Sequence, residues 1–220
     1  MKRFFLFCMA ICFSALFAAP ALAQSVDEIL AKVEARYSQI GFTADFSQTT
    51  TIKSLGISDT ASGKMWIQRP DKIRWEYQTP EVQTIVSNGT TVWIYKPADH
   101  QVFQGKSEAL FGSGKGGMFL SNPRLIREHY YFSLDEPAHN SQHVLKLLPK
   151  QKTNEASLVL VIVSKTNYNI LQLTTFTASG EQTTINLKNI VFTNTIDPSQ
   201  FQFTVPKEVD VIQLNANGTK

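Results

Sequence analysis

The histidines of this sequence have no spacing that would bind a metal ion. They are His100, His129, His139 and His143. None of them belongs to a pattern such as H-E-x-x-H, in which two imidazoles share one face of a helix. We therefore expect surface histidines and no metal site.

A glycine-rich stretch, GSGKGG at 112–117, contains part of a phosphate-binding loop. The P-loop motif needs a glycine where this chain has Ala109, and a serine or threonine where it has Gly116. No G-x-S-x-G nucleophile elbow is present either. The glycines of 112–117 therefore predict a flexible hinge. The missing motifs predict that the protein has no nucleotide cofactor and no enzyme activity.

One arginine stands where the strand pattern favours an apolar side chain. The sequence MWIQRPDKIRWEY at 65–77 predicts two strands around a Pro-Asp turn, and alternation places Arg69 on the face of Met65 and Ile67. A guanidinium there would offer five donors to the interior of the protein. The alternative is that Arg69, at a strand end, extends to water. Arg74 alternates with its apolar neighbours and is expected to face away from them.

Two kinds of element would position these residues. Ser25 and Glu28 form a capping box that begins a helix over about 25–40, which Gly41 ends. From Phe42 onward apolar residues recur with period two, which indicates a strand. Further strands are expected at 58–68, 72–79, 82–87, 90–96, 129–134, 142–148, 157–164, 169–178, 181–192 and 201–205.

Tight turns between these strands predict an antiparallel meander of about 10–11 strands, which must curl into an incomplete barrel. The segment 106–128 interrupts it with short apolar pieces between Gly-rich and Asn-Pro breaks, so we expect helical turns there. A further helical turn is expected at 197–200. With the first helix, segment 106–128 would form a lid over the opening of the sheet.

The first 23 residues have the composition of an export signal. Two basic residues precede an apolar run, and a small-x-small site, Ala21 to Ala23, ends it. Both cysteines, Cys8 and Cys12, fall within this segment and away from its cleavage site, so we expect neither a lipid anchor nor a disulfide. About 200 residues remain, 24–220, enough for a single domain. The net charge of +3 includes Lys2 and Arg3, and nucleic acid is not an expected partner.

Several strands are apolar on both faces, as in SLVLVIVS at 157–164. A sheet of this kind must bury both faces. An ordinary packed core is one interpretation. The other is a pocket for an acyl chain, each methylene of which contributes about 0.8 kcal/mol on burial. The predicted lining of the pocket consists of apolar residues of the strands and of the insertion: Phe46, Met65, Ile67, Ile73, Trp75, Leu110, Phe111, Met118, Phe119 and Leu120.

Four segments give the sequence a family resemblance. They are GFTADFSQ, SGKMWIQRPDKIRWEYQTP, IVSNGTTVWIYKP and FQFTVPKEVDVIQL. In this order, and spanning nearly the whole chain after residue 23, they resemble the LolA family of periplasmic outer-membrane lipoprotein carriers. The chain departs from familiar members in segment 106–128, where GSGKGG stands in place of a Thr-Pro-Phe stretch.

The resemblance implies an incomplete antiparallel β-barrel, covered by an α-helical lid and enclosing a hydrophobic cavity. Family members are periplasmic carriers without covalent chemistry or cofactor. They accept lipoproteins, by their acyl chains, from an inner-membrane ABC transporter and deliver them to an outer-membrane receptor. Arg69 matches a family arginine that hydrogen-bonds to the lid backbone and favours the closed state. We expect a monomer.

Two related functions need separate consideration. The outer-membrane receptor of the same pathway shares the fold but is itself a lipoprotein, and this chain lacks the acceptor cysteine. A periplasmic carrier of another lipid, a glycolipid or a phospholipid, would have the same pattern, and the residues do not separate it from a lipoprotein carrier.

Overall fold

The N-terminal helix begins at the capping box that the sequence predicts. The structure, a computed structural model, describes residues 24–38, 41–69, 71–107, 120, 122–135, 141–151 and 156–214. In α1 (Val26–Tyr37), the Glu28 backbone N–H donates to Ser25 Oγ and the Ser25 N–H donates to the Glu28 carboxylate, both at 3.2 Å. One face of α1 is fully buried, which fixes the helix on the sheet.

The described strands form one sheet of twelve, in the order β12-β6-β5-β4-β3-β2-β1-β11-β10-β9-β8-β7. The strands before segment 106–128 are β1 (Gly41–Ile52), β2 (Ile57–Gln68), β3 (Lys72–Thr79), β4 (Gln83–Asn88), β5 (Thr91–Lys96) and β6 (Gln101–Lys106). Those after it are β7 (Tyr130–Leu134), β8 (Gln142–Pro149), β9 (Leu158–Ser164), β10 (Ile170–Phe176), β11 (Glu181–Thr193) and β12 (Asp210–Gln213). Short helices are α4 (Leu125–His129), η1 (Lys53–Leu55) and η3 (Pro198–Phe201). The predicted class, mainly β and incompletely closed, is confirmed, and the sheet stays open between β12 and β7.

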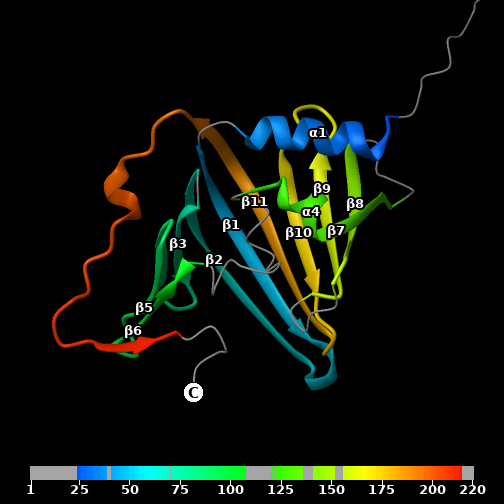
Figure 1. The fold of residues 1–220 in the computed structure, drawn as a ribbon. Coiled ribbons are helices and arrows are strands. Elements are labelled where there is room, and N and C mark those ends of the chain that lie inside the picture. The colour runs from blue at the N-terminus through cyan, green and yellow to red at the C-terminus, as the bar shows by residue number, and fades with distance from the viewer. Residues whose placement is uncertain are drawn as a thin grey trace, which may run out of the picture.

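The sheet divides into two wings that diverge from its long central strands (Figure 1). We call β2–β6 with β12 the first wing, and β7–β11 the second wing. They are joined where β1 pairs with β11, from Gly41 opposite Thr193 to Ile52 opposite Glu181. Helix α1 lies across one end of the strands of the second wing (Figure 1).

The inner face of the sheet carries the main hydrophobic core. Side chains from α1, from α4 and from Leu120 pack there against residues of β1–β3 and of the second wing. Tyr37 at the end of α1 contacts Phe42 and Phe192 edge to face, with ring centroids 5.3 and 5.2 Å away. The helices therefore fill the inner face of the second wing.

The outer face of the first wing is covered by the chain that follows β11. Phe201 of η3 is buried, and the Phe203 ring lies 6.1 Å from that of Trp93 and 5.7 Å from that of Tyr95. The chain then pairs as β12, in parallel with β6. With its outer face covered in this way, the first wing has its inner face left for other contacts.

Some sequence expectations were wrong at the C-terminal end. The run 201–205 is not a strand, because its phenylalanines cover the outer face instead of pairing in the sheet. Strands β6 and β12 were not predicted. The predicted helical turn near 197–200 is confirmed as η3, and the described part of the 106–128 insertion includes α4 except for its last residue, His129. No helix of the described residues is long and apolar enough to cross a membrane.

A hydrogen bond between Tyr37 and Ile170 generates a stability prediction. The pairing of β10 with β9 is irregular between Ile170 and Gln172, and the Ile170 N–H donates to the Tyr37 hydroxyl at 2.8 Å instead. Burial raises the pKa of Tyr37 well above its ordinary value. We expect Tyr37→Phe to lower the free energy of unfolding by about 1–3 kcal/mol, because it leaves a buried N–H unpaired.

Urea unfolding monitored by circular dichroism measures this loss. The control is Tyr131→Phe, since Tyr131 is 66% exposed, and its effect should stay within about 0.5 kcal/mol. A loss for Tyr37→Phe no larger than that of the control would contradict the assignment.

Candidate ligand-binding site

The β2–β3 hairpin places four of the predicted lining residues on one face. Met65 pairs with Trp75 and Ile67 pairs with Ile73, so their side chains lie opposite each other on the inner face of the sheet. The turn is held by Ser87, whose hydroxyl donates to the carbonyl of Asp71 at 2.9 Å. Asp71 has a positive φ of 53°, which aspartate tolerates better than most residues.

Phe46 packs against this group because the neighbouring strand has a glycine opposite it. Phe46 pairs with Gly63, where a Cβ atom would lie within 1.8 Å of the carbonyl oxygen of Glu76 and 3.0 Å of the Phe46 ring. The missing side chain lets Phe46 approach Trp75 and Tyr77, with ring centroids 5.7 and 4.9 Å away. Burial raises the pKa of Tyr77 to about 12, and its hydroxyl donates to a side-chain oxygen of Gln48.

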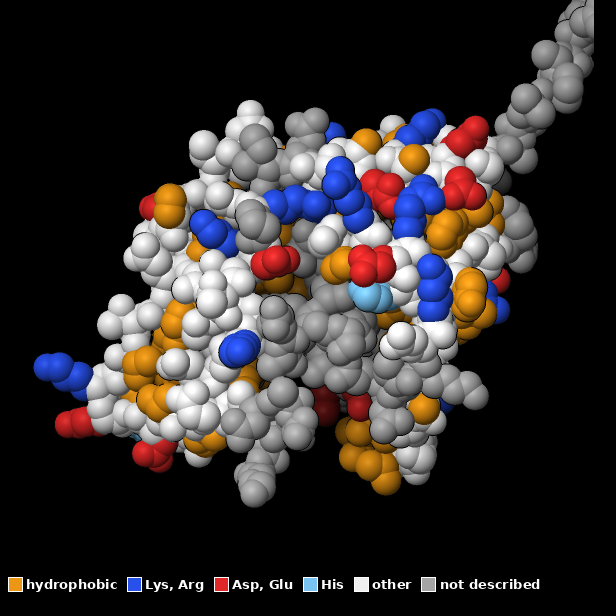
Figure 2. Space-filling model, in the orientation of Figure 1, with side chains coloured by type: hydrophobic (Ala, Val, Ile, Leu, Met, Phe, Trp, Pro, Cys, Tyr) orange, Lys and Arg blue, Asp and Glu red, His pale blue; other side chains and the backbone are white. Residues whose placement is uncertain are grey.

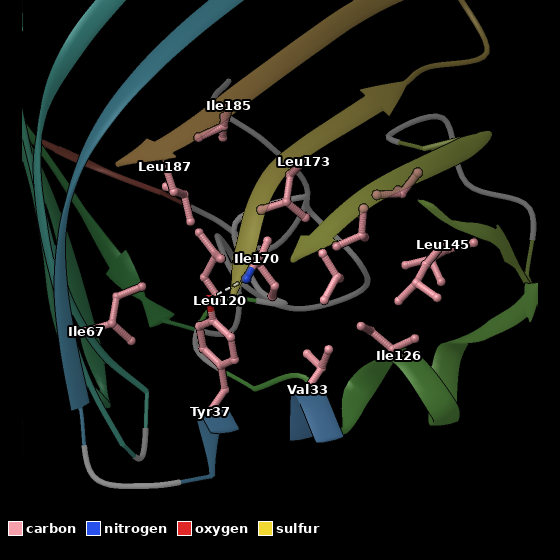
Figure 3. Close-up of a cluster of buried hydrophobic side chains, with 14 of the residues drawn as sticks. Val33, Tyr37, Ile67, Leu120, Ile126, Leu145, Ile170, Leu173, Ile185 and Leu187 are labelled. Atoms are coloured by element: carbon pink, nitrogen blue, oxygen red, sulfur yellow. Dashed lines mark hydrogen bonds between the residues drawn. The ribbon is translucent and has the colours of Figure 1, made fainter. Parts of the chain in front are cut away.

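The described lining residues belong to the main core or pack against it. Phe46, Met65, Ile67, Ile73 and Leu120 are each at most 3% exposed, and the half-buried Trp75 packs against them. Figure 3 shows Leu120 and the side chains of α1, α4 and the sheet pointing toward one another. The predicted lining residues that lie outside the described residues are Leu110, Phe111, Met118 and Phe119.

A continuous apolar row extends this surface across the first wing. Starting opposite Met65, each successive strand contributes one residue that lies directly opposite the previous one. These residues are Trp75, Ile85, Ile94, Phe103 and Ile212. Met65 is fully buried, whereas the five residues beyond it are half-buried. The structure therefore adds Ile85, Ile94, Phe103 and Ile212 to the candidate site. The alternation in 82–87 and 90–96 places the first two on one face, but nothing in the sequence aligns the strands.

Arg69 lies at the end of β2, in the turn to β3. Its Nη2 atom is buried and has no hydrogen-bond partner in the described part of the chain. Burial lowers the pKa of the Arg69 guanidinium and the nearby charge of Arg124 lowers it further, while Asp71 opposes both effects. Arginine stays charged in proteins, so Arg69 is a partly buried cation whose Nη2 has no partner among the residues that the structure describes.

Arg74 faces the other side of the sheet, as alternation predicts. It forms an ion pair with Glu76 at 2.6 Å and donates to the backbone carbonyl of Gln200 at 3.3 Å. Arg74 therefore helps to hold η3 on the outer face. Among the described residues, no group of three or more His, Cys, Asp or Glu side chains is placed to hold a metal ion.

Ionic contacts connect the two helices that cover the second wing. Arg127 of α4 donates to Glu34 at 2.8 Å and to Asp27 at 2.7 Å, both in α1. These hydrogen bonds, led by that to Asp27, raise the pKa of Arg127. Figure 2 shows Lys and Arg side chains interspersed with Asp and Glu over this part of the surface. The Arg127 side chain is 36% exposed, so solvent screens these contacts and each adds little to stability.

This arrangement predicts a local effect of Arg127→Ala. Loss of the ion pairs should speed amide hydrogen exchange in 122–129 while exchange in α1 stays unchanged, because the hydrophobic contacts of α1 remain. Hydrogen exchange with mass spectrometry measures both segments. Lys188→Ala, at an exposed position of β11, is the control and should change neither. Equal acceleration in α1 and α4 would contradict a local connection.

An open, curved sheet with a helical cover on one wing and an apolar row on the other defines the structural class of this protein. Residues 38–204 match the family model described as "Outer membrane lipoprotein carrier protein LolA", and the chain therefore belongs to the LolA family.

Two relatives and one solved structure illustrate the similarity. A protein of Chromobacterium violaceum named outer-membrane lipoprotein carrier protein is 32% identical over 213 residues, covering 96% of this chain and 98% of its own. A protein of Nitrosomonas europaea with the same name is 33% identical over 174 residues, covering 78% of this chain and 82% of its own. The crystal structure of an uncharacterized conserved protein from Thermus thermophilus has a TM-score of 0.56 at 15% identity, covering 86% of this chain and 99% of its own.

Proposed function

We propose that this protein carries lipoproteins through the periplasm by holding their acyl chains against the inner face of the first wing. The observation that carries the proposal is the row from Trp75 to Ile212, which is apolar yet only half-buried. The membership of this protein in the LolA family supports lipoproteins as the cargo over another lipid. Relatives that are named as lipoprotein carriers support it as well.

The chemistry of the row suits an acyl chain. An alkyl chain has no polar group to satisfy, and burial contributes about 0.8 kcal/mol for each methylene. The strands of the first wing are about 4.8 Å apart, so a row across five strands spans roughly 20 Å. A chain of about sixteen carbons has a comparable extended length.

The proposed cycle assigns a role to Arg69 and to two membrane partners. Arg69 would hydrogen-bond to the lid backbone in the empty protein and release it when cargo enters. The partners would be an inner-membrane ABC transporter that supplies the lipoprotein and an outer-membrane receptor that accepts it. The carrier would work as a monomer without catalysis.

Native mass spectrometry of the protein, taken from the periplasm of cells depleted of the outer-membrane receptor, tests the cargo. We expect one-to-one complexes with triacylated lipoproteins. Recovery with phospholipid or glycolipid instead would overturn the lipoprotein assignment and leave the lipid-binding surface in place. Recovery of empty protein would overturn both.

A carboxylate in the apolar row should prevent acyl-chain binding. Ile85→Asp places a charge on the inner face of β4, where an acyl chain would have to desolvate it, so we expect at least a roughly tenfold loss of affinity for a synthetic triacylated lipopeptide. Fluorescence titration measures the affinity. Thr84→Asp puts the same charge on the outer face of the same strand and should leave binding unchanged. Equal losses for both variants would exclude the inner face as the binding surface.

Loss of the Arg69 guanidinium should affect transfer rather than folding. We expect Arg69→Leu to accept lipoprotein from the transporter and to release it poorly, because the empty closed state loses its hydrogen bonds. A reconstituted transfer assay to the receptor measures release. Lys64→Leu, at an exposed site on the outer face of β2, is the matched control. Transfer by Arg69→Leu at the rate of this control would exclude the proposed role.

A further inference from the structure

Buried polar atoms at the candidate site indicate where the polar linkage of the cargo lies. We propose that Trp75 Nε1 donates a hydrogen bond to an ester carbonyl of the acylated cargo, and that Arg69 Nη2 binds a carbonyl oxygen nearer to the peptide. The inference rests on the proposed function and adds a specific recognition chemistry to it.

Trp75 differs from the other residues of the apolar row because its side chain carries a polar group. Its indole N–H is buried and has no partner within the part of the chain that the structure describes. An indole nitrogen is a donor only, and leaving a buried donor unpaired is unfavourable. A phenylalanine would supply a ring at this position without that cost. The unpaired donor is therefore explained if the ligand brings an acceptor.

A second tryptophan shows how the same group is satisfied elsewhere in this protein. Trp93 lies on the outer face of β5, and its Nε1 donates to a side-chain oxygen of Gln104 at 3.2 Å. Gln104 is directly opposite Trp93 on β6. The residue opposite Trp75 on β4 is Ile85, which has no side-chain acceptor. Among the described residues, the inner face thus provides a donor without an acceptor, and the outer face provides both.

The second donor, Arg69, lies in the turn at one end of the hairpin, and the alternation of Met65 and Ile67 predicts the same face for it. Trp75 is opposite Met65, and Arg69 follows Met65 by four residues, a separation of about 13 Å along β2 that the long arginine side chain can shorten. In a diacylglyceryl-cysteine, about eight bonds separate an ester carbonyl from the first peptide carbonyl, a span of roughly 10 Å. One ligand can therefore reach both donors.

Two other buried polar atoms lack partners among the described residues, and they do not fit this role. Gln68 Oε1 and Asn122 Oδ1 are acceptors, so they cannot bind a carbonyl oxygen. Gln68 also alternates with Ile67 and belongs to the outer face. The Trp75 and Arg69 donors consequently favour ligands that carry acceptors at the base of their acyl chains.

Paired ligands that differ only in the linkage test the inference. One is a synthetic lipopeptide with ester-linked hexadecanoyl chains, and the other is its ether-linked analogue, which lacks the ester carbonyls. We expect the unmodified protein to bind the ester form about five- to tenfold more tightly, the effect of one net hydrogen bond. Trp75→Phe should abolish this preference while its affinity for the ether form stays within about twofold.

The control is Trp93→Phe, which removes an indole N–H from the outer face and should keep the ester preference. Persistence of the preference in Trp75→Phe, or equal weakening of both ligands, would overturn the inference while leaving the carrier function intact. Failure of the unmodified protein to bind either lipopeptide would overturn both. A diacyl phospholipid is the third ligand. If it binds as tightly as the ester lipopeptide and depends equally on Trp75, the donor role is supported and the lipoprotein source is rejected.

Discussion

Pairing of β1 with β11 is the interaction on which the rest of this structure depends. It joins strands from opposite ends of the chain over the full length of β1 and makes two wings into a single sheet. A continuous sheet has one inner face, and its apolar side chains must be buried by whatever the chain can place there. Helices α1 and α4 with Leu120 fill this face over the second wing and β1–β3. Further out, the apolar row of the first wing is only half-buried.

The two faces of the first wing differ in how far their side chains are covered and hydrogen-bonded. On the outer face, η3 and Phe203 cover the aromatic residues. The side chains of Trp93 and Arg74 donate hydrogen bonds to acceptors on the same face. On the inner face, apolar surface is partly exposed and the Trp75 indole N–H has no partner among the described residues. Arg69 Nη2, in the turn that follows β2, has none among them either. Both features suit the acyl-chain site proposed above, because an alkyl chain can cover the apolar row and a ligand carbonyl can accept from the indole.

The two helices of the cover are held by different kinds of contact. Buried side chains and the bond from Ile170 to Tyr37 fix α1 to the sheet. Helix α4 is short, and Arg127 connects it to α1 through partly exposed ion pairs. Contacts of that kind contribute little free energy and are readily exchanged for water. Helix α1 is therefore fixed by buried contacts, whereas α4 contributes the buried Ile126 to the core and reaches α1 through contacts of small free energy.

The sequence by itself determined the features that depend on neighbouring residues. The capping box of α1, the β2–β3 hairpin and the outward face of Arg74 follow from spacing over a few positions. Tertiary structure decided how the first wing is completed, because β12 pairs with a strand far away along the chain and the pattern of 201–205 suits either a strand or a covering segment. It also decided that the apolar row is half-buried and that Trp75 has no acceptor among the described residues. Both depend on which strands lie opposite one another, and long-range pairing leaves no local signal in the sequence.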